Sequence, residues 1–224
     1  MRTRVLKLSG VAAAVALIGV AIGLYITEFL MSGPPTTSPP VRVSAGRKSV
    51  RLTIQTVAAV GPTLSPHANW VSYLVRHQGK WVRSTIWTVP AHALVHVTVY
   101  QFDGKSGLRN PFMAKVRGTV GGSMTVNGKT LNVINPDDAS HTFAIPQLHV
   151  LVPLKGVADN AKNQCGFAPC AQSNAHNTIT FTFRTAGKGH YRWQCFVPCA
   201  AGWIFGFGGP MQTIGYMDGF LNVV

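Results

Sequence analysis

Two cysteines near the C-terminal end of the chain have a spacing that suits metal binding. Cys195 and Cys199 are separated by three residues, and they follow Gly189-His-Tyr-Arg-Trp-Gln, a segment that alternates like a strand. Thiolate sulfur is a soft ligand, and the end of a strand would hold it rigidly. The same two thiols could instead form a disulfide, and the sequence does not separate these two possibilities.

A histidine upstream offers a third ligand. His141 lies in Asn135-Pro-Asp-Asp-Ala-Ser-His-Thr-Phe, which indicates a loop entering a strand. One imidazole and two thiolates form a mixed set of borderline and soft ligands, which suits copper better than the other common metals. No histidine follows Cys195 in the sequence, so the set is incomplete on that side. Met211 and Met217 are candidates for a weak axial thioether ligand.

The elements that would position these ligands are strands. Segments with strand-like alternation or β-branched residues cover 49–57, 69–76, 93–101, 129–134, 142–145, 178–184, 189–194 and 219–224. Short strands separated by Gly, Pro and Asn are typical of a sandwich or barrel. The sequence therefore predicts an all-β domain over residues 49–224, without a long amphipathic helix inside it.

Taken together, these segments resemble the cupredoxin family. Gly189-x-Tyr191-x-x-x-Cys195 is similar to the strand that carries the copper cysteine, and Met217-Asp-Gly219 is similar to the closing Met-x-Gly turn. Asp137-Asp-Ala-Ser-His141 resembles the segment with the first copper histidine, most closely in subunit II of cytochrome c oxidase and in nitrous oxide reductase. The resemblance implies a cupredoxin-like Greek-key β-sandwich and copper bound by His141, Cys195, Cys199 and Met217.

The C-terminal loop departs from the pattern of those relatives. Their copper A domains carry Cys-x-x-x-Cys-x-x-x-His-x-x-Met, whereas this chain has Trp203 at the histidine position and Gly206 at the methionine position. Four alternatives remain: a mononuclear copper site, a modified dinuclear site with a ligand from His149 or another subunit, a Cu(I) carrier site, and a metal-free domain. The metal-free alternative would make the chain a structural subunit, as in the quinol oxidase relatives of subunit II.

The function implied by the resemblance is one-electron transfer, alone or within a respiratory or copper-containing oxidase or monooxygenase complex. The sequence shows no catalytic triad, paired carboxylates or phosphate-binding loop, so enzymatic activity of the chain alone is not expected. With 20 Lys and Arg against 6 Asp and Glu, the formal charge is +14, which favours anionic partners such as an acidic redox protein or lipid headgroups. No nucleic-acid motif is present, so nucleic acid is not an expected partner.

The N-terminal region predicts a membrane anchor. Residues 1–31 combine a short basic leader with an apolar run, from Leu8 to about Met31, that is long enough to cross a bilayer. Residues 32–48 begin with a proline-rich stretch and predict an extended linker. We therefore expect a single-pass protein of the cell membrane whose C-terminal domain lies outside the cytoplasm.

The remaining cysteines agree with export. Cys165 and Cys170 enclose a short loop in a segment rich in Gly, Pro, Asn and Gln. An even number of cysteines in an exported domain first indicates disulfides. The sequence therefore predicts a local disulfide between Cys165 and Cys170.

Overall fold

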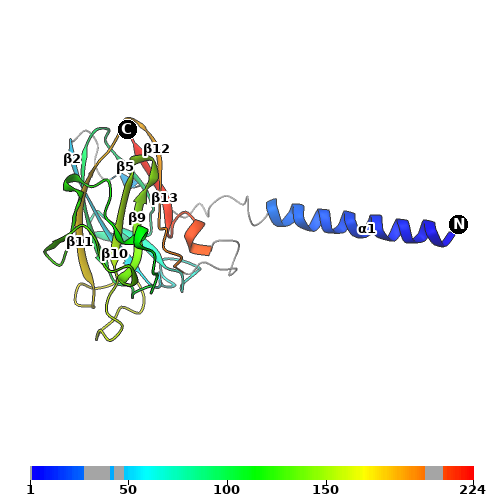
Figure 1. The fold of residues 1–224 in the computed structure, drawn as a ribbon, viewed down its shortest axis with the longest axis horizontal. Helices are drawn as coiled ribbons and strands as arrows, with labels where there is room; N and C mark the ends of the chain where they lie inside the picture. Colours follow the sequence, from blue (N-terminus) through cyan, green and yellow to red (C-terminus); the bar gives the residue numbers. More distant parts are fainter. Residues whose placement is uncertain (1, 28–40, 43–47, 200–208) are drawn as a thin grey trace.

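Two β-sheets packed against each other form the folded domain (Figure 1). The computed structural model describes residues 2–27, 41–42, 48–199 and 209–224. Within these residues, the six-stranded sheet has the order β1 (Val41–Arg42), β5 (Ile86–Val89), β13 (Asp218–Val223), β12 (Gly189–Gln194), β9 (Ala139–Ile145) and β10 (Val150–Lys155). The seven-stranded sheet has the order β4 (Lys80–Val82), β3 (Ser72–His77), β2 (Ser49–Val57), β6 (Leu94–Gln101), β11 (Asn177–Arg184), β7 (Met124–Val126) and β8 (Lys129–Leu131).

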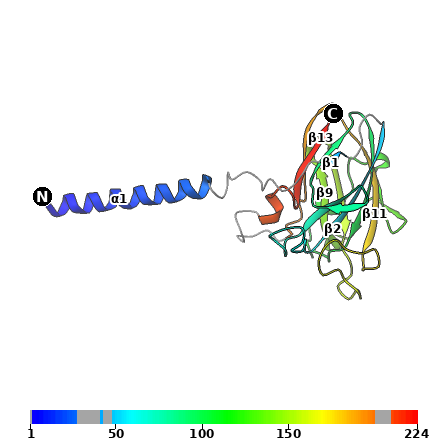
Figure 2. The ribbon, with the colours of Figure 1, turned by 180° about the vertical axis from the view of Figure 1, so that it is seen from behind.

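Strands that are distant in the sequence are neighbours in both sheets. In the six-stranded sheet, β12 lies between β13 and β9 and is antiparallel to both. In the seven-stranded sheet, β6 lies between β2, with which it is parallel, and β11, with which it is antiparallel. Figure 2 shows the same sandwich from behind, with β2 and β11 on one side of it and β13 on the other. The arrangement confirms the predicted all-β sandwich.

Alternation of apolar and polar residues builds the core between the sheets. The inward-facing side chains of β6 are Val95, Val97 and Val99, and those of β11 are Ile179, Phe181 and Phe183, all of them buried. The six-stranded sheet contributes large aromatic rings, with Trp87 and Trp193 stacked at a centroid distance of 4.5 Å. Burial of aromatic rings of this size supplies a large part of the stabilisation of a small sandwich.

Short 3-10 helices connect several strands and carry parts of the site described below. They are η2 (Pro111–Ala114), η3 (Val120–Gly122), η4 (Pro136–Asp138), η5 (Pro146–Leu148) and η6 (Gly209–Gln212). In η4, the Asn135 side chain accepts a hydrogen bond from the Asp137 backbone N–H and caps the turn immediately before β9. The loop expected ahead of His141 is therefore a capped turn that fixes where β9 begins.

Five strands of the described residues were not predicted: β1, β4, β5, β7 and β10. β10 contains Pro153, which lacks a backbone N–H and speaks against a strand in a sequence pattern. Its place at the edge of the six-stranded sheet removes the conflict, because its outer side is paired only through the isolated bridge between Leu151 and Arg117 among the described residues, and Pro153 needs no N–H there. β4, β5 and β7 are short, and strands of three or four residues carry little periodicity.

The N-terminal segment forms α1 (Arg2–Tyr25). Among the residues described here, no helix combines the length and the apolar character needed to cross a membrane, so the structure does not bear out the transmembrane helix predicted within residues 1–31. Most of the predicted linker, residues 32–48, lies outside the described residues. Its Val41–Arg42 forms β1, which pairs in parallel with Trp87 and Thr88 of β5.

Candidate metal centre

His141 reaches the site from β9, a strand that is buried along its whole length. β9 lies between β12 and β10 in the six-stranded sheet, and each of its residues is buried. The His141 side chain is 0% exposed. A buried imidazole has no water to satisfy its two ring nitrogens, so both need partners inside the protein.

Hydrogen bonds from backbone N–H groups hold Cys195 between β9 and the residue before β13. Its N–H donates to the carbonyl of Met217 at 2.9 Å, which continues the ladder between β12 and β13 past its last strand pair. The Thr142 N–H donates to Cys195 Sγ at 3.3 Å. The Phe196 N–H donates to Thr142 Oγ1 at 2.7 Å. These bonds hold the Cys195 sulfur beside the residue that follows His141.

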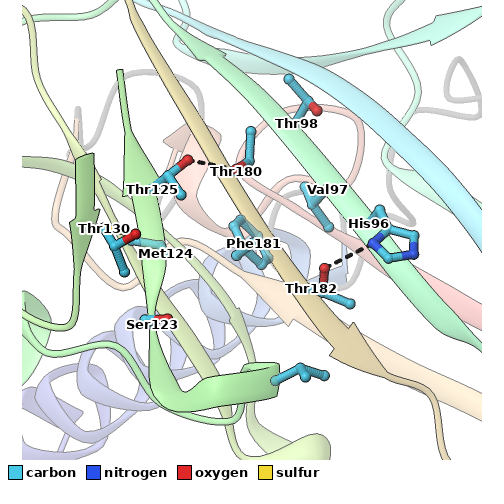
Figure 3. Close-up of a pocket in the computed structure, with 11 residues that line it drawn as sticks. His96, Val97, Thr98, Ser123, Met124, Thr125, Thr130, Thr180, Phe181 and Thr182 are labelled. Atoms are coloured by element: carbon cyan, nitrogen blue, oxygen red, sulfur yellow. Dashed lines mark hydrogen bonds between the residues drawn. The ribbon is translucent and has the colours of Figure 1, made fainter. Parts of the chain in front are cut away.

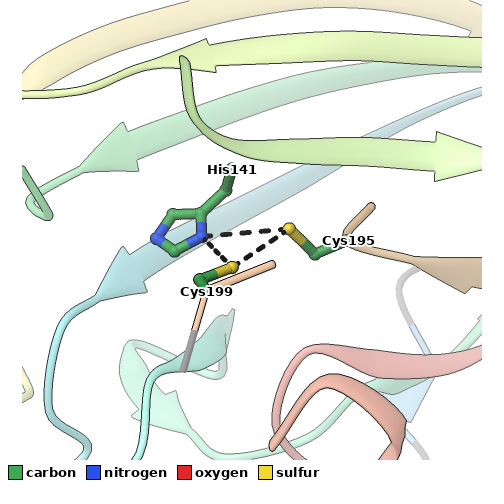
Figure 4. A group of neighbouring side chains, drawn as sticks. All are labelled: His141, Cys195 and Cys199. Atoms are coloured by element: carbon green, nitrogen blue, oxygen red, sulfur yellow. Dashed lines mark hydrogen bonds between the residues drawn. The ribbon is translucent and has the colours of Figure 1, made fainter. Parts of the chain in front are cut away.

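The three predicted ligands converge (Figure 4). The ligand atoms of His141, Cys195 and Cys199 all lie within 4.8 Å of one another. His141 Nδ1 is 3.0 Å from Cys199 Sγ and 3.9 Å from Cys195 Sγ, and the two sulfur atoms are 3.4 Å apart. His141, Cys195 and Cys199 thus bring one nitrogen and two sulfur atoms together in one compact cluster.

A thioether lies next to this cluster. Cys199 is brought back toward β9 by a tight turn, in which its N–H donates to the Val197 carbonyl at 2.7 Å. The sulfur of Met211, from η6, is 3.5 Å from Cys199 Sγ. Met211 is 7% exposed, so its sulfur is held in a nearly dry place. A third sulfur atom therefore borders the cluster.

The two cysteines of the cluster are not joined. A disulfide bond requires a sulfur–sulfur distance near 2.05 Å, and Cys195 and Cys199 are free thiols at 3.4 Å. Of the two possibilities that the sequence left open, the structure has the pair available for metal binding.

The second ring nitrogen of His141 has an acidic partner. His141 Nε2 is 3.0 Å from Oδ2 of Asp103, which follows β6 of the other sheet. The Asp103 side chain is 23% exposed, whereas the imidazole is fully buried. With Nε2 engaged by the carboxylate, Nδ1 is the nitrogen that faces the two sulfur atoms.

Hydrogen bonds and charges within the cluster shift the pKa values of His141 and Cys195 in the direction opposite to burial. Burial alone would lower the pKa of His141, but the hydrogen bonds to Asp103 and Cys195 outweigh it and raise the pKa to about 9. Burial alone would raise the pKa of Cys195, but the hydrogen bonds from Cys199 and His141 bring it well below its ordinary value. The cluster without metal therefore favours a Cys195 thiolate beside a His141 imidazolium.

The neighbouring groups respond to that thiolate. The hydrogen bond to Cys195 and burial raise the pKa of Cys199 far above its ordinary value. Burial, together with the two cysteine sulfurs, raises the pKa of Tyr73, whose hydroxyl donates to the Thr142 carbonyl at 3.0 Å. Cys199 thus stays a neutral thiol beside the Cys195 sulfur, and Tyr73 stays a neutral phenol bonded to the backbone of β9.

The donor chemistry of the cluster fits copper. Imidazole nitrogen and thiolate sulfur are ligands of copper in both of its common oxidation states, and thioether sulfur adds a soft, weak contact. His141, Cys195 and Cys199 would hold the ion, with Met211 beside them. The cluster is buried, and burial around a metal site limits solvent access and influences its redox potential.

The other sequence-predicted residues have separate positions. Met217 is fully buried in the apolar core and forms backbone hydrogen bonds with Cys195 and Pro210, so its role as a ligand stays a prediction. His149 is exposed and ends η5 with a left-handed backbone conformation, outside the cluster. Trp203 and Gly206, at the positions where copper A domains have His and Met, lie outside the described residues.

Sequence reasoning missed Asp103. It precedes His141 by 38 positions and follows a strand of the opposite sheet, so no local spacing connects the two. Met211 was considered from sequence, but the Met-x-Gly resemblance favoured Met217. The only signal for Asp103 is the scarcity of acidic residues, 6 in the whole chain, which makes each buried or half-buried carboxylate worth examining.

The predicted disulfide between Cys165 and Cys170 is confirmed. Gln55 of β2 holds the bridge against the seven-stranded sheet: its side chain donates to the Cys170 carbonyl at 2.7 Å and accepts from the Cys170 N–H at 3.1 Å. This bridge is separate from the Cys195–Cys199 pair, so the four cysteines divide into one disulfide and one pair of free thiols.

A shallow pocket of about 290 Å³ is lined by residues of β6, β7 and β11 of the seven-stranded sheet (Figure 3). Its polar groups satisfy one another: Thr125 and Thr180 hydroxyls are 2.6 Å apart, and His96 Nδ1 is 2.9 Å from the Thr182 hydroxyl. His96 is therefore an ordinary exposed strand residue. The pocket contains no acidic residue or thiol among its described lining residues, and it does not compete with the metal cluster as the functional site.

Comparisons with known proteins give weak structural similarities. No protein-family model and no curated protein matches the chain. Rusticyanin from Thiobacillus ferrooxidans aligns with 85% of this chain and 86% of its own at 19% identity and a TM-score of 0.34. The metal-binding domain of the Streptococcus pneumoniae D39 Cu(I)-exporting P-type ATPase CopA, solved with Cu(I), aligns with 84% of this chain and 97% of its own at 8% identity and a TM-score of 0.36. The function below rests on the residues of this chain.

Proposed function

We propose that this chain is a cupredoxin-type protein that binds copper through His141, Cys195 and Cys199 and serves one-electron transfer. The observation that carries the proposal is the convergence of one imidazole nitrogen and two free thiol sulfurs within 4.8 Å in a nearly fully buried place. Soft and borderline donors gathered in this way select copper.

The metal-free alternative explains fewer of these features. A structural domain without metal would be expected to fill this position with apolar side chains or a disulfide, because burying a charged His–Cys pair is costly. Here the His141–Cys195 pair is retained, and a carboxylate contacts it from the opposite sheet. A metal ion would replace the Cys195–His141 proton and use each of these groups.

The protein contributes ligands, exclusion of water and a fixed geometry. Bound copper supplies the redox change itself. The Thr142 N–H donates to the Cys195 sulfur, and hydrogen bonds of this kind tune the potential of a copper–thiolate site. Tyr73 and Trp193, whose rings are 4.8 Å apart, pack in the core next to the cluster and keep solvent away from it.

A second candidate function is the carriage of Cu(I). The observation that favours it is the third sulfur atom, from Met211, at 3.5 Å from Cys199 Sγ. Thiolate and thioether ligands select Cu(I), and a site dominated by them would resist oxidation to Cu(II). A mononuclear site is the simplest arrangement for one nitrogen and three sulfur atoms, and a modified dinuclear copper A centre would need further ligands.

The cellular setting remains part of the proposal. A disulfide between Cys165 and Cys170 is typical of an oxidising compartment, so we place the domain outside the cytoplasm. A formal charge of +14 suits an acidic redox partner or subunits of a membrane oxidase or monooxygenase complex. Attachment to the cell membrane through residues 1–31 is a separate prediction, which detergent dependence of extraction would test.

Metal analysis combined with visible absorption tests the proposal. The purified protein is loaded with Cu(II) and with Cu(I) under anaerobic conditions, desalted, and assayed for copper per chain. An electron-transfer site gives stoichiometric copper and, in the oxidised form, intense absorption from thiolate bound to Cu(II). A Cu(I) carrier gives stoichiometric Cu(I) but loses metal or stays colourless after oxidation. Absence of bound copper in both states would leave the structural-subunit alternative.

A further inference from the structure

Asp103 connects the two sheets at the metal cluster. It follows β6 of the seven-stranded sheet, and its Oδ2 lies 3.0 Å from Nε2 of His141 on β9 of the six-stranded sheet. Among the described residues, this carboxylate is the acidic group in contact with the cluster. It is not a member of the ligand set, because it meets the imidazole on the side opposite to the sulfur atoms.

The position of Asp103 is fixed by its own backbone neighbourhood. Its second carboxylate oxygen, Oδ1, accepts the Gly104 N–H at 2.7 Å, and its backbone carbonyl accepts the Val157 N–H at 2.9 Å. Gly156 lies against this segment so closely that a Cβ on it would be 2.5 Å from the Gly104 carbonyl oxygen. Both carboxylate oxygens of Asp103 therefore accept hydrogen bonds, and the backbone around Asp103 is closely packed against Gly156.

An ion pair next to Asp103 also holds the segment 103–105 in place. Lys105 forms an ion pair with Asp138 at 2.7 Å, and Asp138 belongs to the capped turn immediately before β9. The Gly156 N–H donates to the Asp138 carbonyl at 2.8 Å. The segment with Asp103 and the turn that leads into the strand with His141 are thus tied together next to the Asp103–His141 contact.

This geometry selects one nitrogen of His141. A carboxylate that accepts the proton on Nε2 leaves the Nδ1 lone pair for a metal, and Nδ1 is the nitrogen that lies 3.0 and 3.9 Å from the two cysteine sulfurs. The hydrogen bond from Nε2 to Asp103 also restrains rotation of the imidazole ring about the Cβ–Cγ bond of His141. Acidic partners of metal-binding histidines act in this way and increase the basicity of the ligand.

We propose that Asp103 is the positioning residue of the copper site, which orients His141 for binding through Nδ1 and places a negative charge that favours Cu(II) over Cu(I). This inference rests on the proposed copper-binding function. It adds a residue that is remote in sequence from the Cys195–Cys199 loop, and it separates two effects, ring orientation and charge, that different substitutions of Asp103 remove.

Three variants of the full-length protein separate these effects. Asp103→Ala removes both the hydrogen bond and the charge, so copper affinity falls about 10- to 100-fold in competition with a chromophoric chelator. Asp103→Asn keeps one oxygen that can accept the Nε2 proton but loses the charge and the acceptor for the Gly104 N–H, so it binds copper more tightly than Asp103→Ala while its reduction potential shifts to a more positive value. Asp159→Asn is the matched control: it removes an equal charge from an exposed position, and it leaves affinity and potential as in the wild type.

The outcomes are distinguishable. If wild-type protein binds copper and Asp103→Asn changes neither its potential nor the electron paramagnetic resonance spectrum of its Cu(II) form, Asp103 has a structural role only and the inference is wrong. The same holds if Asp159→Asn shifts the potential as much as Asp103→Asn does. If Asp103→Ala does not fold, as judged by circular dichroism, the Asp103→Asn potential decides. If the wild type binds no copper, the proposed function fails first and the inference falls with it.

Discussion

The sulfur atoms of Cys195 and Cys199 lie 3.4 Å apart, and the imidazole of His141 faces both of them. At this distance the sulfurs are in contact without a bond, so both can bind one ion from neighbouring directions. Cys195 is held by the backbone of β9 and β13, whereas Cys199 depends on the turn at Val197. The two thiols are therefore not equivalent, and their substitution has different consequences.

Substitution of Cys195 by Ser should remove the colour of the copper-loaded, oxidised protein. The Thr142 N–H and the Met217 carbonyl hold Cys195 in a fixed position, so we expect Cys195 to supply the thiolate responsible for most of the charge-transfer absorption. Cys199→Ser should keep part of the absorption and weaken copper retention. Visible spectra of both variants, recorded at equal copper content, check this prediction, and equal loss of colour in the two variants would contradict it.

Substitution of Met211 and substitution of Met217 should affect different properties of the protein. Met211→Ala should shift the reduction potential and weaken Cu(I) retention, because the Met211 sulfur lies 3.5 Å from Cys199 Sγ. Met217→Ala should act mainly on the free energy of unfolding, since loss of a fully buried Met side chain costs about 2–5 kcal/mol. Voltammetry and chemical denaturation separate the two effects. A potential shift confined to Met217→Ala would restore Met217 as the axial ligand.

Removal of the Cys165–Cys170 disulfide should destabilise the domain without removing the metal site. The bridge closes a short loop, for which chain entropy predicts a stabilisation of roughly 2 kcal/mol. The double variant Cys165→Ser, Cys170→Ser should therefore unfold at lower denaturant concentration and still bind copper. Loss of copper binding in a folded double variant would show that the pairing assigned here is incomplete.

The ion pairs of Asp138 should make stability depend on pH in the acidic range. Hydrogen bonds from Lys105 and Lys155 outweigh desolvation and lower the pKa of Asp138 below 3.8. A lowered pKa in the folded state adds stability above the unfolded-state value, and that stability is lost as the pH falls through the folded-state value. Asp138→Asn should thus be slightly less stable than the wild type at pH 7, and the difference should vanish as the pH falls through the lowered, folded-state pKa of Asp138. A difference that persists unchanged at low pH would contradict the charge-based explanation.

Much of the fold could be predicted because its central strands carry their pattern locally. Residues 49–57 form a strand with the predicted bounds, and residues 94–101 and 177–184 match within one position. β5 and β10 were missed for physical reasons. β5 is four residues long, and β10 contains a proline that is tolerated only because the strand lies at a sheet edge.

The site could be predicted where its members are carried on regular strands or are close in sequence. Cys195 and Cys199 are four positions apart, and His141 follows a turn signal that fixes the start of β9. Asp103 could not be found in this way, because its contact with His141 depends on how the two sheets pack. The choice between Met211 and Met217 also depends on the path of a long loop, whose length no local periodicity determines.

Copper K-edge X-ray absorption of the copper-loaded protein tests the central claim most directly, because it counts the sulfur and nitrogen neighbours of the ion. The account predicts a shell with two cysteine sulfurs and one imidazole nitrogen, which loses one sulfur in Cys199→Ser and its nitrogen in His141→Ala. A shell of nitrogen and oxygen atoms alone, or a spectrum unchanged by both substitutions, would show that copper binds elsewhere and would contradict the assignment of this cluster as the metal centre.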